Sequence, residues 1–113
     1  MLYEMKLKAP YFNLIKTGTK IYEVRLNDEK RRLIKVGDKI TFKKEPELEE
    51  TLQTEVEDLI PFNTFSELLR TLPLDKIGFA DGKEADVEAI YHNIYSKEDE
   101  KKYGVLAIKV KLL

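Results

Sequence analysis

The segment Gly18-Thr19-Lys20-Ile21-Tyr22-Glu23-Val24-Arg25 places two cations and a carboxylate directly after a predicted helix. The helix is expected over residues 10–17, because Pro10 suits a first helical position and Gly18 suits a left-handed C-terminal cap. Charged side chains this close together, where the predicted helix ends, indicate a functional site.

The residues that follow the glycine have the pattern of a strand. Over residues 20–26, the apolar side chains that alternate with charged ones are Tyr22, Val24 and Leu26. A period of two sends this apolar set toward the core and the charged set to the other face. Glu23 and Arg25 are therefore expected side by side, with Lys20 near enough to complete a small pocket for a polar, partly anionic ligand.

The pattern Gly-x-Lys-x-x-Glu-x-Arg, formed here by Gly18, Lys20, Glu23 and Arg25, resembles the signature of the ASCH family. In its element order, nearly the whole chain resembles the small stand-alone bacterial and archaeal members of this family. The resemblance implies an α+β, PUA-like fold: a mostly antiparallel β-barrel of five or six strands with flanking helices. It also implies a groove in which the four motif residues bind RNA or a nucleotide-like ligand.

The remaining elements are predicted from periodicity, turns and caps. Alternation and turn residues predict strands at residues 2–8, 20–26, 39–44, 52–60 and 104–113. Apolar stripes predict helices from a cap at Asn63 or Thr64 to about Leu72, and over residues 84–95. These elements describe a scaffold around the motif.

Length and composition favour one domain over residues 1–113. The chain has 113 residues, 42% of them hydrophobic, which suits a single core, and it has no cysteine for a disulfide or a thiolate metal site. No apolar run approaches the ~20 residues that span a bilayer, and the N-terminus lacks a signal-peptide core. A cytoplasmic protein without a cofactor or membrane partner is expected; the oligomeric state stays open.

Net charge argues against generic binding of duplex DNA. Twenty Lys and Arg residues face twenty-one Asp and Glu residues, for a formal charge of −1. A local basic patch beside the pocket is still expected from residues 30–32 and from the next turn and strand, whose cations are Lys35, Lys39, Lys43 and Lys44. The alternative is a solvated charged loop.

Several residues are expected to flank the pocket. Arg31, Arg32 and Tyr103 are predicted contacts, and the candidates for stacking on an unstacked base are Tyr11, Phe12, Tyr22 and Tyr103. The lone histidine, His92, has no second ligand to complete a metal site, which favours a surface or helix-packing role.

Two other functions compete with binding of RNA or a nucleotide-like ligand. Some small ASCH-like proteins are amidohydrolases that act on N4-acetylcytidine, which would assign catalysis to Lys20 and Glu23. Glu23 stands where those enzymes have a threonine nucleophile, and the candidates for their later glutamate are Asp81, Glu84 and Glu88. The third possibility is a protein-interaction module in which the signature is a structural ion network.

Overall fold

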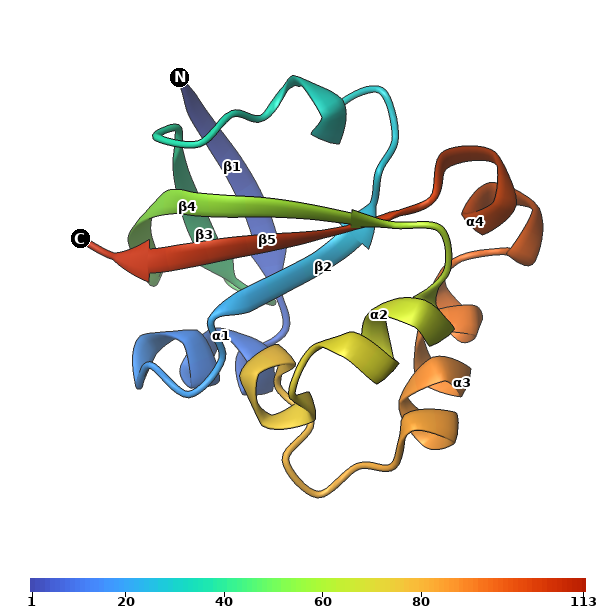
Figure 1. Ribbon diagram of the computed structural model, residues 1–113. Coiled ribbons are helices and arrows are strands. Elements are labelled where there is room, and N and C mark those ends of the chain that lie inside the picture. Colours follow the sequence, from blue (N-terminus) through green and yellow to red (C-terminus); the bar gives the residue numbers. More distant parts are fainter.

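A curled sheet of five strands organises the molecule, and the computed structural model describes all residues 1–113 (Figure 1). In chain order the elements are β1 (Leu2–Leu7), α1 (Ala9–Lys16), β2 (Tyr22–Leu26), the short 3-10 helix η1 (Arg31–Leu33), β3 (Lys39–Lys44), β4 (Thr51–Phe62), α2 (Phe65–Thr71), the 3-10 helix η2 (Leu74–Ile77), α3 (Glu84–Ile94), α4 (Lys97–Tyr103) and β5 (Val105–Leu112).

The strands lie in the order β1-β3-β4-β5-β2, so that β1 and β2 are the edges. Only β1 and β3 are parallel; the other neighbours are antiparallel. The expected α+β fold with a mostly antiparallel sheet is therefore confirmed, as a five-stranded half-barrel whose two edge strands do not pair with each other.

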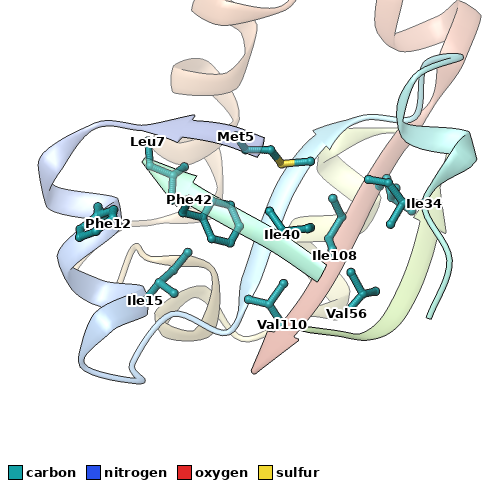
Figure 2. Packing of buried hydrophobic residues seen from close by; sticks show 11 residues of the cluster. Met5, Leu7, Phe12, Ile15, Ile34, Ile40, Phe42, Val56, Ile108 and Val110 are labelled. Carbon is teal, nitrogen blue, oxygen red and sulfur yellow. The ribbon is translucent and has the colours of Figure 1, made fainter. Parts of the chain in front are cut away.

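Two hydrophobic clusters cover the two faces of this sheet. The first fills the inside of the curl and extends to α1; its members are Met5, Leu7, Phe12, Ile15, Ile34, Ile40, Phe42, Val56, Leu106, Ile108 and Val110 (Figure 2). The second lies between the sheet and helices α2 and α3, with Val24, Leu26, Phe65, Leu68, Leu69, Ile77, Val87, Tyr91, Val105 and Ala107. Because β5 supplies alternate residues to each cluster, it reads as a nearly continuous apolar run.

Local signals set most element boundaries. Gly18 has φ +84° directly after α1, the left-handed conformation expected of its cap. The hydroxyl of Thr64, rather than Asn63, accepts a hydrogen bond from the backbone N–H of Glu67 and caps α2.

Several predicted ends differ from the observed ones by one or two residues, and the start of β2 and helix α4 differ for identifiable reasons. Strand β2 begins at Tyr22, because the backbone N–H groups of Lys20 and Ile21 donate to carbonyls of Leu14 and Lys76 instead of a strand. The prediction also lacked helix α4, whose almost entirely polar sequence shows no apolar stripe; its signal was the cap Ser96, which accepts a hydrogen bond from the N–H of Asp99.

Candidate ligand-binding cleft

A cleft of about 380 Å³ opens between the edge of the sheet and helix α3. Its walls come from segments that are far apart in the sequence: the end of β1, α1, β2, the loop after η2, and the C-terminal half of α3. The residues that line it are Lys6, Leu7, Lys8, Tyr11, Lys20, Glu23, Val24, Arg25, Glu45, Ile77, Phe79, Ile90, Tyr91, Asn93, Ile94 and Tyr95.

Lys20 is buried at the floor of this cleft, with 3% of its surface exposed. Its Nζ donates to the carbonyl oxygens of Tyr22, at 2.6 Å, and Ile77, at 2.9 Å, and lies 3.3 Å from Oε1 of Glu23. These contacts use the donor capacity of the ammonium group and tie β2 to η2. Burial lowers the pKa of Lys20, and the Glu23 carboxylate only partly offsets that effect.

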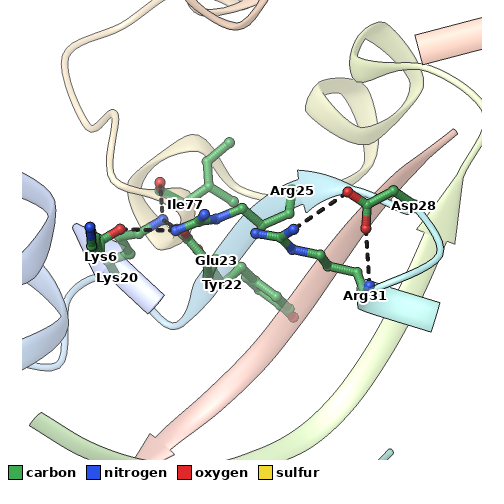
Figure 3. Close-up of polar contacts among 8 residues, drawn as sticks. All are labelled: Lys6, Lys20, Tyr22, Glu23, Arg25, Asp28, Arg31 and Ile77. Atoms are coloured by element: carbon green, nitrogen blue, oxygen red, sulfur yellow. Dashed lines mark hydrogen bonds and ion pairs between the residues drawn. The ribbon is translucent and has the colours of Figure 1, made fainter. Parts of the chain in front are cut away.

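Glu23 and Arg25 complete the network (Figure 3). Nε of Arg25 donates to Oε2 of Glu23 at 2.7 Å, and Nη2 of Arg25 donates to the carbonyl oxygen of Lys6 at 3.0 Å. Burial acts to raise the pKa of Glu23, but the charges and hydrogen bonds of Lys20 and Arg25 outweigh it, and the pKa lies below its usual value. Since Lys6 belongs to β1, Arg25 joins the two edge strands where the sheet does not close.

Arg25 is the motif cation that retains donors toward the cleft. Its side chain is 18% exposed, against 3% for Lys20, and its two hydrogen bonds leave further N–H groups of the guanidinium unused. Both oxygens of Glu23 are already bonded to cations. A ligand in the cleft would therefore bond with Arg25 before it could bond with Lys20 or Glu23.

Aromatic rings form much of the cleft wall: Tyr11, Phe79, Tyr91 and Tyr95. The rings of Tyr11 and Phe79 lie 5.6 Å apart, and those of Phe79 and Tyr91 lie 5.9 Å apart in an edge-to-face arrangement. Phe65 stacks behind Tyr91 and Tyr95, at 4.7 and 5.6 Å, and holds the two tyrosines in place.

The tyrosine hydroxyls on this wall are poor acids. Burial, with the nearby charge of Glu23, raises the pKa of Tyr91, and burial raises the pKa of Tyr95 although Arg25 acts in the opposite direction. Both hydroxyls therefore stay protonated at neutral pH and can donate hydrogen bonds. At the rim, Ile90 and Ile94 are 38% and 62% exposed.

The structure brings three of the four motif residues into the cleft. Gly18 does not line it: this glycine is exposed and acts through the backbone, by ending α1. A second glycine, Gly78, lies directly against the side chain of Lys20. Gly78 has φ +103°, and a Cβ there would lie 3.2 Å from Cδ of Lys20, so a larger residue would press on the network.

The predicted flanking residues lie elsewhere. Arg31 pairs with Asp28 at 3.4 Å, outside the cleft lining, although its charge acts on the Tyr95 hydroxyl. Arg32 donates to the carbonyl oxygens of Asn27, at 2.7 Å, and Tyr103, at 3.2 Å. Tyr103 lines a separate hollow.

Of the other stacking candidates, only Tyr11 lines the cleft. Phe12 is completely buried in the first cluster, and Tyr22 packs against the second. The sequence prediction missed Tyr91 and Tyr95, whose signal was a pair of tyrosines at i, i+4 on one predicted helix.

The charged residues expected beside the pocket are also placed elsewhere. None of Lys35, Lys39, Lys43 and Lys44 lines the cleft; Lys43 pairs with Glu4 at 3.1 Å and Lys44 with Glu50 at 3.5 Å. The candidate later carboxylates Asp81, Glu84 and Glu88 do not line it either. The second carboxylate of the cleft is Glu45, which the sequence reasoning did not single out.

His92 has a packing role. Its Nε2 lies 2.9 Å from Oε1 of Glu100, and its ring meets the edge of Phe65. Oε2 of Glu100 accepts the backbone N–H of Phe65 at 2.7 Å, so this pair joins α3 and α4 to the start of α2. No group of three His, Cys, Asp or Glu side chains is arranged to hold a metal ion.

Comparison with known proteins agrees with this fold. The family model of the ASCH domain matches residues 5–113. The chain belongs to the ASCH domain family. The motif that brings Lys20, Glu23 and Arg25 together therefore stands in an ASCH fold, with its buried polar floor facing the cleft.

Solved structures similar to this ASCH protein include two with complete or nearly complete coverage. The crystal structure of hypothetical protein PH0355 is 35% identical, with a TM-score of 0.89 and full coverage of both chains. The solution structure of protein PF0455 from Pyrococcus furiosus is 36% identical, with a TM-score of 0.80 over 100% of this chain and 98% of that one.

A more distant match supports the fold alone. The crystal structure of an ASCH domain from Lactobacillus crispatus is 17% identical, with a TM-score of 0.63 over 98% of this chain and 79% of that one. No curated protein matches the sequence significantly. None of the helices of this ASCH protein is long and apolar enough to cross a membrane.

Proposed function

We propose that the cleft binds the base of an RNA nucleotide or of a related nucleotide-like ligand. The observation that carries this proposal is the combination of aromatic walls with a fixed polar floor on which only Arg25 retains donors toward the cleft. Membership of the ASCH family, whose domains are thought to bind RNA, adds support. The cleft volume, about 380 Å³, is near the lower end for ligand pockets and suits one base or nucleoside.

The chemistry of the wall matches a planar heterocycle. Every nucleobase has a face that can stack on an aromatic ring, at about 1–3 kcal/mol per base. Tyr95, directly after α3, is partly exposed on the cleft, whereas Tyr91 of α3 is buried. The Arg25 guanidinium then supplies donors for a carbonyl oxygen of the base or for a phosphate oxygen.

The geometry gives less support to the amidohydrolase alternative. A carboxylate that activates water must accept a proton, but both oxygens of Glu23 are bonded to cations and its pKa is lowered. At the position where those amidohydrolases have their threonine nucleophile, this chain has Glu23, which has no hydroxyl group. We therefore propose binding without turnover, and release of acetate from N4-acetylcytidine would contradict it.

The ion network also has a structural role, since it ties β2 to β1 and η2. This role does not compete with ligand binding, because the network forms the floor of the cleft and leaves Arg25 partly exposed. If the domain were only a protein-interaction module, nucleosides would not bind in this cleft.

The test is a titration followed by NMR and thermal shift, with cytidine, N4-acetylcytidine, adenosine and short single-stranded RNAs, and with free acetate assayed in parallel. The variants are Arg25→Gln and Tyr95→Ala. Arg70→Gln is the matched control, because Arg70 is exposed on α2 and lines neither the cleft nor the hollow that contains Tyr103. A charged hydrogen bond contributes about 1.5–3 kcal/mol, so Arg25→Gln should weaken binding by roughly 10- to 100-fold.

The control should leave binding unchanged, and the resonances that shift should be those of residues in the cleft. Tyr95→Ala keeps the motif intact and so separates loss of binding from loss of the ion network. Absence of saturable shifts with every probe, or wild-type affinity in both Arg25→Gln and Tyr95→Ala, would refute the proposal.

A further inference from the structure

A second and larger hollow, of about 740 Å³, lies at the other side of the α3–α4 junction. Asn27, at the end of β2, and Tyr103, at the end of α4, are among its lining residues, together with Lys97, Lys101 and Lys102. The connection from β4 to α2 forms the opposite wall. Few of the lining side chains are hydrophobic, which makes this a polar surface.

The cations beside this hollow have no carboxylate partners. Lys97, Lys101 and Lys102 are exposed and form no ion pair, and Arg32 bonds only to backbone carbonyls. Five lysines of the sheet and of α1 form ion pairs: Lys16, Lys43, Lys44, Lys109 and Lys111. Lys6 and Lys8, which line the cleft, form none. The hollow brings three unpaired lysines of the α4 helix together, in a protein whose net charge is −1.

The nearby carboxylates offset only part of this charge. Glu100 lines the hollow but is buried, and its two oxygens are bonded to His92 and to the backbone N–H of Phe65. Glu98 and Asp99 belong to the same helix but are not part of the lining. Glu67 is the remaining acidic side chain on the wall.

Two segments of the chain line the cleft at one position and the hollow at a position two residues further on. Arg25 of β2 lines the cleft and Asn27, the residue directly after β2, lines the hollow; two positions span ~7 Å in extended backbone. At the α3–α4 junction, Tyr95 lines the cleft and Lys97 the hollow. A chain molecule with one unit in the cleft would therefore place its next units over the unpaired cations.

We propose that this hollow, with Arg32 and the α4 lysines Lys97, Lys101 and Lys102, binds the phosphodiester backbone of single-stranded RNA whose base occupies the cleft. This inference rests on the proposed function of the cleft and makes it more specific. The ligand is an RNA strand rather than a free nucleoside. Single strands fit because their unstacked bases are available to a cleft, while phosphates need only positive charge.

Tyr103 adds a second stacking surface within the hollow. It is partly exposed, and the ammonium group of Lys102 lies 5.1 Å from the centre of its ring. An aromatic ring beside a cation is the arrangement that single-strand binding surfaces use for successive bases and phosphates.

The test compares binding of fluorescein-labelled six-nucleotide RNA, measured by anisotropy, with binding of cytidine, measured by NMR. The variant is Lys97→Gln/Lys101→Gln/Lys102→Gln. The control, Lys35→Gln/Lys39→Gln/Lys83→Gln, removes the same charge from exposed lysines that line neither hollow. Circular dichroism confirms folding, and Lys101→Gln alone serves if the triple variant is unfolded.

If the three lysines neutralise three phosphates, the RNA affinity of the wild type should fall ~20-fold when the salt concentration rises from 50 to 200 mM. The hollow variant should lose most of this salt dependence and bind RNA at least ~10-fold more weakly at 50 mM salt, with its affinity for cytidine unchanged. If the control variant lost as much RNA affinity, the effect would come from the net charge of the protein and not from the hollow, and the inference would be overturned.

Other outcomes separate this inference from the proposed function. If the hollow variant binds RNA as tightly as the wild type, this inference is wrong but the proposed function of the cleft is unaffected. If Arg25→Gln and Tyr95→Ala do not weaken binding of cytidine, the proposed function of the cleft is wrong. Competition by oligoglutamate as strong as by unlabelled RNA would identify an acidic protein segment as the occupant and overturn the assignment to RNA.

Discussion

Replacement of Lys20 by methionine tests whether the signature holds the fold together. The side chain of methionine has a similar length, but the substitution removes the ammonium group that Glu23 and the carbonyl oxygens of Tyr22 and Ile77 share. The carboxylate and both carbonyls would lose a donor in a region where Lys20 is only 3% exposed.

The expected cost follows from burial rather than from distance. Removal of one partner of a buried ion pair costs about 3–5 kcal/mol. Arg25 would still pair with Glu23, so the cost here comes from Oε1 of Glu23 and the two carbonyl oxygens, which lose their buried donor. The pair between Lys16 and Glu50 is shorter, at 2.7 Å, but both side chains are exposed, and such pairs contribute about 0–1 kcal/mol. Lys16→Met is therefore the matched control.

Urea unfolding followed by circular dichroism measures both variants. Lys20→Met should lose about 3–5 kcal/mol of unfolding free energy, a large part of the roughly 5–15 kcal/mol that stabilises a domain. Lys16→Met should lose less than about 1 kcal/mol. The loss in the double variant Lys20→Met/Glu23→Gln should be smaller than the sum of the two single losses by about 0.5–3 kcal/mol, because both substitutions break the same contact.

Equal effects of Lys20→Met and Lys16→Met would refute this reasoning. So would a double variant whose loss is the sum of the two single losses, since the lysine and the glutamate would then be energetically independent.

Two further predictions concern the same network. Gly78→Ala should cost more stability than Gly18→Ala, by about 1 kcal/mol in urea unfolding, because both glycines have positive φ but only a Cβ at position 78 meets the Lys20 side chain; equal losses would show that Lys20 moves away freely. For pH, the pKa of Glu23 in the folded protein lies below its ordinary value of 4.5, so its ionised form contributes stability that is present above about pH 4.5 and is lost as the pH falls toward the folded pKa. The unfolding free energy of Glu23→Gln should therefore decline less steeply than that of the wild type below about pH 4.5, and parallel curves would contradict the lowered pKa.

The sequence by itself determined the local elements and the identity of the motif. Pro10 and Gly18 delimit α1, period-two alternation identifies β2, and Thr64 caps α2, since these signals act between neighbours in the chain. The motif was visible for the same reason, because its residues lie within one short segment.

Only the tertiary structure decided which way the motif faces. Alternation distinguishes two faces of a strand and assigns the charged one to solvent, but Glu23 is 5% exposed because the sheet curls and both of its faces are covered. The other walls of the cleft come from α3 and from the segment after β3, as Tyr95 and Glu45 show, and no spacing rule connects these positions to Arg25. Contacts between distant segments depend on how the curled sheet packs against its helices, so the cleft and the neighbouring hollow emerge only in three dimensions.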